Sequence, residues 1–280
     1  MNPKKTYPIV LSIAGSDSSG GAGIQADLKT FSALGVYGST AITAITAQNT
    51  LGVHAQCPIP PQMVYDQIVA VLDDLHPLYV KIGMLSNPEI VQTVAEALSK
   101  YPLTIVLDPV MVSSSGHRLL SVEAQDLVKQ KLLPMATLVT PNLPEMEALT
   151  ALPLSTYEEK ERAARCLMDS GAQAILLKGG HEEGEVKTDI LFSNSTTGIQ
   201  STLFTSETVA TRNIHGTGCT LSSAITAFLA RGLALEEAIV EAKKYISNAI
   251  QSGADIAIRH GFGPVNHGFN PQKMIVHETR

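Results

Sequence analysis

The sequence has few cysteines, few charged residues, and no long run of basic or apolar residues. Its three cysteines, Cys57, Cys166 and Cys219, are unevenly spaced and form no paired-thiol motif, so we expect a reducing, cytoplasmic location without disulfides. The net charge is −6 and no basic run is present, which argues against nucleic acid as a partner. No apolar run is long enough to span a membrane. The short apolar run after Lys4 and Lys5 leads into a glycine-rich turn, so we reject a secretory signal.

Length and composition favour a folded α/β protein. The 280 residues suffice for a substantial core, and 44% apolar with only 16% charged residues suggests many buried parallel strands. Strand and helix patterns alternate without repeats or a linker, which predicts one doubly wound α/β domain over residues 1–280 with a mostly parallel sheet. We expect strands at 9–14, 39–46, 78–82, 103–107, 136–140 and 174–178, helices at 24–34, 61–75, 88–98, 122–132, 158–170 and 235–251, and an antiparallel edge pair at 186–192 and 198–204.

A glycine-bearing turn, residues 215–219, runs directly into an apolar helical pattern. Gly216 and Gly218 allow a ligand to approach the backbone, and the first amides of the following helix are free to bind an anion such as phosphate. Cys219 lies in the same turn, where the helix field favours the thiolate and is expected to bring its pKa close to neutrality. The turn therefore predicts a phosphoryl-transfer site. The alternative is an ordinary turn with a buried cysteine; a dinucleotide fingerprint fits less well, because Leu221 stands where the third glycine belongs.

A second glycine-rich segment, residues 15–23, follows the first predicted strand. The spacing of Gly15 and Gly20 is that of a Walker A loop, but a Gly-Ala pair stands where Lys-Ser/Thr is required, so a P-loop NTPase is excluded. The segment is instead predicted to bind substrate, with Asp17 and Asp27 offering acceptors. Either aspartate could equally cap a helix or be solvated, and for Asp17 capping is at least as good an explanation.

Polar side chains recur where predicted strands end, the usual ligand position in open parallel sheets. The amide of Gln48 suits the edge of a heteroaromatic ring, although it could also stabilise its own loop. Asp108, Asn142 and Glu145 could hold a hydrated magnesium ion. Capping of the next helix is a compatible role for the last two of these. Lys178 is placed to meet a phosphate as a point charge.

Seven motifs then follow one another across nearly the whole chain, from Ile9 to Pro264. In order, they are IAGSDSSGGAGIQADLKTF (13–31), AITAQNT (44–50), KIGML (81–85), LDPVM (107–111), TPNLPE (140–145), KGGH (178–181) and HGTGCTLS (215–222). Together they resemble the hydroxymethylpyrimidine/phosphomethylpyrimidine kinases of thiamine biosynthesis. Any one of them could arise by chance, but seven in family order are very specific.

The resemblance implies a ribokinase-like three-layer α/β/α fold and two successive ATP-dependent transfers, from hydroxymethylpyrimidine to its monophosphate and then to the diphosphate. It also implies Mg²⁺ and a homodimer. The site residues that it implies fall into four groups: Gly15, Asp27, Gln48 and Met84 for the pyrimidine; Asp108 and Glu145 for the metal; Asn142, Thr217 and Lys178 for the nucleotide; and Gly216, Gly218, Cys219 and again Lys178 for catalysis, with the two glycines as the anion hole and the cysteine as the base.

One residue differs from the wider ribokinase-like family and supports the narrower assignment to the pyrimidine kinases. The wider ribokinase-like sugar kinases carry aspartate where Cys219 stands, and cysteine there is typical of the pyrimidine kinases.

A pyridoxal or pyridoxine kinase of the same fold is the first alternative function, although Gln48 and Met84 favour a pyrimidine. A non-catalytic pyrimidine-binding module is the second. The combination of two carboxylates, a lysine and a cysteine argues against it, because a sensor needs no base beside an anion hole.

Overall fold

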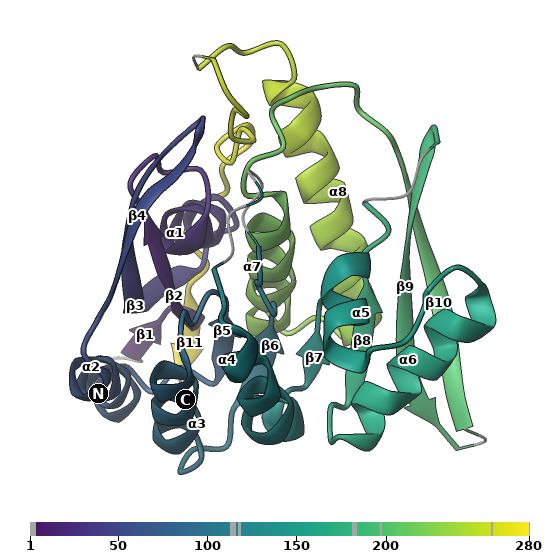
Figure 1. Cartoon of the computed structure of the whole chain (residues 1–280). Coiled ribbons are helices and arrows are strands. Elements are labelled where there is room, and N and C mark those ends of the chain that lie inside the picture. Colours follow the sequence, from purple (N-terminus) through teal and green to yellow (C-terminus); the bar gives the residue numbers. More distant parts are fainter. Residues whose placement is uncertain are drawn as a thin grey trace.

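The computed structural model describes residues 4–112, 116, 119–180, 184–196, 198–258 and 260–279. Most of the polar loop 113–118, and the histidine that ends the KGGH motif, lie outside these residues. A large twisted sheet runs through the molecule with helices on both sides (Figure 1). The nine strands of this sheet are β2 (Ile9–Asp17), β3 (Tyr37–Asn49), β4 (Gly52–Pro58), β5 (Tyr79–Ile82), β6 (Thr104–Leu107), β7 (Leu138–Val139), β8 (Ala174–Leu177), β9 (Val186–Ser195) and β10 (Gly198–Glu207).

The order of the strands confirms the predicted fold class. Across the sheet it is β10-β9-β8-β7-β6-β5-β2-β3-β4. The strands from β8 to β3 in this order pair in parallel, whereas β4, β9 and β10 pair antiparallel at the two edges. The carboxyl ends of the parallel strands therefore meet at one edge of the sheet, which is where the polar residues of the predicted site should lie.

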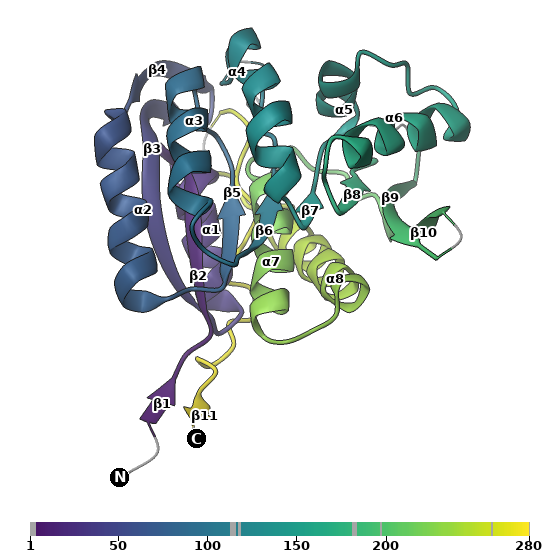
Figure 2. The same ribbon diagram turned by 90° about the horizontal axis from the view of Figure 1, so that it is seen from below.

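Helices cover both faces of the sheet (Figure 2). One face carries α1 (Gly23–Ala33), α7 (Thr217–Ala230) and α8 (Leu235–Gly253), and the other carries α2 (Pro61–Leu75), α3 (Pro88–Leu98), α4 (Val122–Leu127), α5 (Leu143–Thr150) and α6 (Tyr157–Asp169). This is the three-layer α/β/α arrangement. None of the described helices is both long and apolar enough to cross a membrane.

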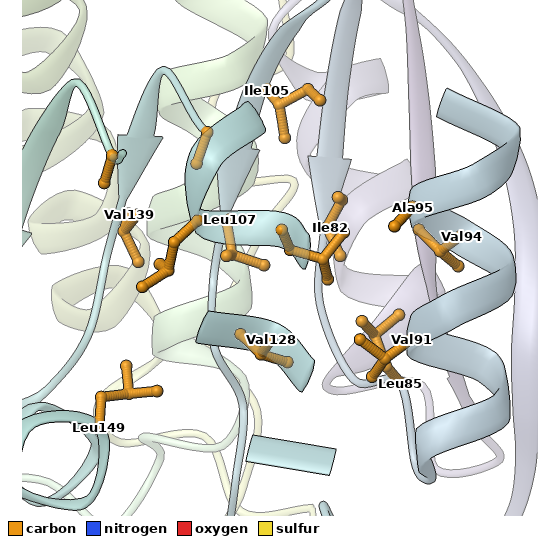
Figure 3. Packing of buried hydrophobic residues seen from close by; sticks show 14 of the residues in the cluster. Ile82, Leu85, Val91, Val94, Ala95, Ile105, Leu107, Val128, Val139 and Leu149 are labelled. Atoms are coloured by element: carbon orange, nitrogen blue, oxygen red, sulfur yellow. The ribbon is translucent and has the colours of Figure 1, made fainter. Parts of the chain in front are cut away.

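Each face of the sheet has its own apolar core because neighbouring residues of a strand point to opposite faces. In β6, Leu107 packs on the face of α3, together with Ile82 and Val91 (Figure 3). Val106, one residue earlier, packs on the opposite face with Ile225 of α7. Strands that are buried on both faces read as nearly continuous apolar runs, and this is why the sequence predicted them well.

Besides shifted strand ends, the structure differs from the predicted elements in three main places. β3 continues to Asn49 and returns as β4, a hairpin that was missed because β4 is polar and largely exposed. The helix predicted over 122–132 is α-helical only to Leu127 and then widens into a π-helical turn, Val128–Leu132. The tail ends in β11 (His277–Thr279), which pairs with β1 (Lys4–Thr6) in a ribbon that projects from the body (Figure 2).

Candidate active site

A cleft of about 780 Å³ lies along the carboxyl ends of the parallel strands. It is lined by both glycine-rich segments and by the residues that follow β5, β6 and β8. All but one of the twelve predicted site residues line it: Gly15, Gln48, Met84, Asp108, Asn142, Glu145, Lys178, Gly216, Thr217, Gly218 and Cys219. The fold therefore brings residues that are up to 204 positions apart into one place, and Asp27 is the exception.

The turn before α7 has the geometry of an anion site. Gly216 is the N-cap residue, with φ of 82°, and α7 has no side-chain cap. A side chain at Gly216 would collide with the Gly21 carbonyl group, so the turn requires glycine for both its conformation and its space. A Cβ on Gly218 would lie 3.4 Å from Lys178 Nζ and 3.7 Å from Asp108 Oδ2. The uncapped first turn of α7 thus lies against the charged residues of the cleft.

Lys178 joins the two carboxylates of the cleft. Its Nζ lies 2.8 Å from Asp108 Oδ1 and 3.8 Å from Glu145 Oε2. Burial opposes the charge on Lys178, but Asp108 and Glu145 outweigh it and raise the pKa of the lysine to about 12. Burial likewise disfavours the charged form of Asp108, and the ammonium of Lys178 holds the pKa of that carboxyl below its usual value. Lysine and aspartate are therefore both ionised at neutral pH.

Glu145 is the carboxylate that titrates near neutrality. Burial, reinforced by the neighbouring Asp108 charge, raises its pKa to about 7 against the effect of Lys178. Its position is fixed by a capping box at the start of α5: Glu145 Oε2 accepts from the Asn142 amide at 2.8 Å, and Asn142 Oδ1 accepts from the Glu145 amide at 2.9 Å. The capping role expected for this pair is thus confirmed, and it also fixes both side chains at the rim of the cleft.

The donor set fits magnesium only together with phosphate. Within the described ranges, no three His, Cys, Asp or Glu side chains converge on a metal position. Asp108 and Glu145 supply two carboxylates around one lysine. Magnesium in phosphoryl-transfer sites is commonly held by one or two carboxylates plus substrate phosphates, and these residues fit that arrangement.

The expected acidity of Cys219 is wrong. Burial is the largest influence on the thiol and raises its pKa to about 11, with Asp27 and Asp108 adding to the effect and Lys81 opposing it. The field of the helix N-terminus, on which the prediction rested, is only one of the influences on this thiol. The structure places the thiol where loss of solvation outweighs favourable charges, so Cys219 is protonated at neutral pH.

The structure does not bring Asp27 to the cleft, where it was expected to bind substrate. Its side chain lies on the inner face of α1, fully buried, where Lys81 Nζ approaches at 2.9 Å. Ser12 and Ser223 donate to it at 2.6 and 2.7 Å. No oxygen of Asp27 is left for a ligand in the cleft. The sequence held a signal for this pair: Lys81 is the only charged residue in the apolar run 78–82, and a buried lysine needs a carboxylate.

Asp17 and His215 are the site residues that the sequence argument missed or left open. The Asp17 carboxylate accepts from the amides of Ser19, Gly21 and Ala22, and His215 Nε2 lies 2.8 Å away. Burial opposes ionisation, but these hydrogen bonds, with that of His215 the strongest, lower the pKa of Asp17 to about 2. Asp17 therefore organises the segment before α1 and ties it to the turn before α7.

Comparisons with known proteins show the family of the chain. Residues 17–266 match the model of the family described as phosphomethylpyrimidine kinase. A hydroxymethylpyrimidine/phosphomethylpyrimidine kinase of Rhizobium meliloti is 48% identical over 260 residues, covering 92% of this chain and 96% of its own. The protein of that name from Escherichia coli is 46% identical over 259 residues, covering 92% and 96%.

Solved structures show the same fold. The crystal structure of phosphomethylpyrimidine kinase from Clostridium difficile 630 superposes with a TM-score of 0.76 at 45% identity, covering 86% of this chain and 99% of that one. The pyridoxal kinase from Staphylococcus aureus in complex with pyridoxal superposes with a TM-score of 0.85 at 35% identity, covering 98% and 99%. The similarity thus extends over nearly the whole chain, including the segments that form the cleft.

Proposed function

The chain belongs to the phosphomethylpyrimidine kinase family, and we propose that it transfers phosphoryl groups from ATP to hydroxymethylpyrimidine and then to the monophosphate, for thiamine biosynthesis. One observation carries the proposal: Lys178, two carboxylates and an uncapped helix turn share a cleft with Gln48 and Met84. The charged residues suit a triphosphate, and the amide with its apolar neighbour suits a flat heteroaromatic ring.

To catalyse this reaction, the protein mainly has to neutralise the negative charge of the transferred phosphoryl group. In phosphoryl transfer, most of the rate enhancement comes from positioning and from stabilising charge on the transferred group. Lys178 supplies a point charge, and the first amides of α7, which lie beside it, supply hydrogen-bond donors. Asp108 and Glu145 would hold Mg²⁺, which neutralises the phosphate oxygens when bound. Asn142 and Thr217, at the starts of α5 and α7, border the same space and are assigned to the nucleotide.

The acceptor ring is assigned to the other end of the cleft. A Cβ on Gly15 would lie 2.7 Å from Met84 Sδ, so the two residues pack closely into one apolar wall. Thr43 Oγ1 donates to the Met84 carbonyl oxygen at 2.6 Å and fixes this residue at the end of β5. Gln48 borders the wall and offers both a donor and an acceptor.

Cys219 is proposed as the proton acceptor through its thiolate. The thiol first gives up its own proton to solvent in the cleft that it lines, and its raised pKa makes the thiolate a minor form at neutral pH but a strong base. The thiolate then takes the hydroxyl proton as the bond from the hydroxyl oxygen to phosphorus forms and the bond from that phosphorus to the leaving ADP oxygen breaks. Cys219→Ala is expected to lower turnover by a factor of order 10² to 10⁴, because that is the usual contribution of a general base, while nucleotide binding persists. Turnover equal to that of the wild type would remove the cysteine from the mechanism.

A steady-state assay of ADP release tests the proposed reaction. Hydroxymethylpyrimidine and its monophosphate should both be phosphorylated in the presence of Mg²⁺. Pyridoxal is the second acceptor to test, because the pyridoxal-bound structure from Staphylococcus aureus shares the fold at 35% identity. Release of ADP with pyridoxal alone would favour a pyridoxal kinase. No ADP with any acceptor, despite pyrimidine binding, would favour a non-catalytic module.

Assembly and location are separate proposals. We infer a cytoplasmic homodimer that needs no nucleic acid or membrane partner, on the basis of the family resemblance, the acidic net charge of −6 and the three unpaired cysteines. Light scattering on the purified protein tests the dimer, and a monomeric mass at working concentration would contradict it.

A further inference from the structure

His215 contacts both the segment before α1 and the residue assigned to the substrate ring. Its Nε2 lies 2.8 Å from Asp17 Oδ2 and 3.4 Å from the side-chain amide of Gln48, at the end placed as Nε2. His215 is buried, and both of its neighbours line the cleft. One ring nitrogen therefore faces both a carboxylate and an amide. Whether it carries a hydrogen determines whether each of them accepts from it or donates to it.

The hydrogen bonds of Asp17 determine whether His215 Nε2 carries a hydrogen. The other partners of Asp17 are N–H and O–H groups that donate to it, from Ser19, Gly21 and Ala22. With a pKa of about 2, the carboxylate is ionised at neutral pH and can only accept. A bare Nε2 lone pair at 2.8 Å from this oxygen would be repelled. His215 Nε2 therefore carries a hydrogen and donates it.

The Gln48 amide must then turn its oxygen toward His215. An amide NH₂ group cannot donate to a nitrogen that already carries a hydrogen, and the two ends of the amide are alike in shape. Thr46 fits the same orientation. Its hydroxyl lies 2.9 Å from the Ser16 carbonyl oxygen and 3.1 Å from the end of the Gln48 amide placed as Oε1, which becomes the NH₂ group when the amide is turned. Since the Thr46 hydroxyl donates its single hydrogen to the Ser16 carbonyl oxygen, its own oxygen can accept from the NH₂ group of Gln48.

We propose that His215 is a specificity-determining positioning residue: its Nε2–H, donated mainly to Asp17, also faces the Gln48 amide, where it favours the amide oxygen and disfavours the NH₂ group. One N–H and one lone pair of Gln48 remain for a ligand. They form an adjacent donor and acceptor in fixed order, complementary to a ring nitrogen beside an exocyclic amino group. A 4-aminopyrimidine has that edge, whereas in the pyridine ring of pyridoxal the nitrogen and the hydroxyl group are not adjacent. The inference rests on the proposed function and names how its substrate is recognised.

The test compares two pyrimidines in variants of His215. The probes are 4-amino-5-hydroxymethyl-2-methylpyrimidine and the analogue without the 4-amino group, and the readout is the ratio of their kcat/KM values. His215→Leu removes the donor and should lower the ratio about fivefold, the effect of one neutral hydrogen bond, with most of the change in KM. His215→Gln, which returns an N–H, should restore it. His267→Leu is the matched control, because His267 also contacts α7, through Thr220, but does not contact Gln48.

Each outcome decides the inference. A ratio that His215→Leu leaves unchanged, while both substrates slow equally, would overturn it and indicate a merely structural residue. If the wild type turns over neither pyrimidine, the proposed function fails, and the ratio of their dissociation constants tests the inference instead. If His215→Leu does not fold, ¹⁵N NMR of the wild type decides: a hydrogen on His215 Nε2 supports the inference, and a bare Nε2 overturns it.

Discussion

Two lysine–aspartate pairs in this protein have nearly the same geometry and different surroundings. Lys81 and Asp27 approach to 2.9 Å with both side chains fully buried. Lys178 and Asp108 approach to 2.8 Å with the lysine side chain 12% exposed at the wall of the cleft. The Lys81–Asp27 pair is cut off from any ligand and holds α1 against the sheet. In the Lys178–Asp108 pair, either charge can instead interact with a ligand in the cleft. Access to the cleft, rather than residue type or distance, separates a structural pair from a chemical one.

Breaking the buried Lys81–Asp27 pair, the sealed pair, should give the largest effect on stability. Lys81→Met is expected to lower the free energy of unfolding by about 3–5 kcal/mol, because it leaves the Asp27 charge buried without a partner. Urea unfolding measures the change. The double variant with Asp27→Asn should recover much of the loss, and Lys244→Met, from an exposed pair, should stay within about 0.5 kcal/mol of the wild type. A double variant no more stable than the single one would contradict the assignment.

Breaking the Lys178–Asp108 pair, the open pair, should lower turnover. Lys178→Met is expected to lower kcat by about 10²–10³-fold, the usual effect of removing one preorganised donor from a developing charge. Steady-state ADP release measures it, at a temperature where circular dichroism shows the variant to be folded. If kcat fell less than tenfold, Lys178 would be no more than a structural partner of Asp108, and the contrast between the two pairs would disappear.

Glu145, beside the open pair, makes stability depend on pH below neutrality. Its pKa is raised to about 7 from 4.5, so the folded state holds the proton more tightly than the unfolded state does. Its contribution to stability is therefore fully present below pH 4.5 and is lost as the pH rises through about 7. Glu145→Gln keeps the capping box and should remove this slope in urea midpoints measured between these pH values. An unchanged slope would assign it to another group.

Asp17 should show a smaller effect of the opposite sign. Its pKa is lowered from 3.8 to about 2, so its contribution to stability is present above pH 3.8 and is lost as the pH falls toward 2. Asp17→Asn should flatten the acid limb of the unfolding curve, whereas Asp74→Asn, at an exposed position, should leave it unchanged. Equal acid limbs in all three proteins would show that the Asp17–His215 contact contributes nothing to folding.

Much of the fold could be predicted from the sequence, but less of its chemistry. Helices α2 and α3 begin and end at the predicted residues, because proline at their starts and strong apolar periodicity mark them. The β4 hairpin was missed because it has little core to bury. Eleven of the twelve predicted site residues line one cleft; most were predicted from glycine turns and strand ends, which local sequence records, and Met84 and Thr217 from the family resemblance. Asp27 was misplaced because its partner lies 54 residues away in another element.

The sequence by itself determined the order of strands and helices, the two glycine-rich segments and the polar residues at the strand ends. These follow from local periodicity and backbone preference, and neighbours along the chain carry both. Only the tertiary structure decided that Asp27 is sealed by Lys81, that the Cys219 thiol has a pKa of about 11, and that His215 faces Asp17 and Gln48. Solvation and charge depend on what surrounds a side chain in three dimensions, and packing between distant segments sets those surroundings.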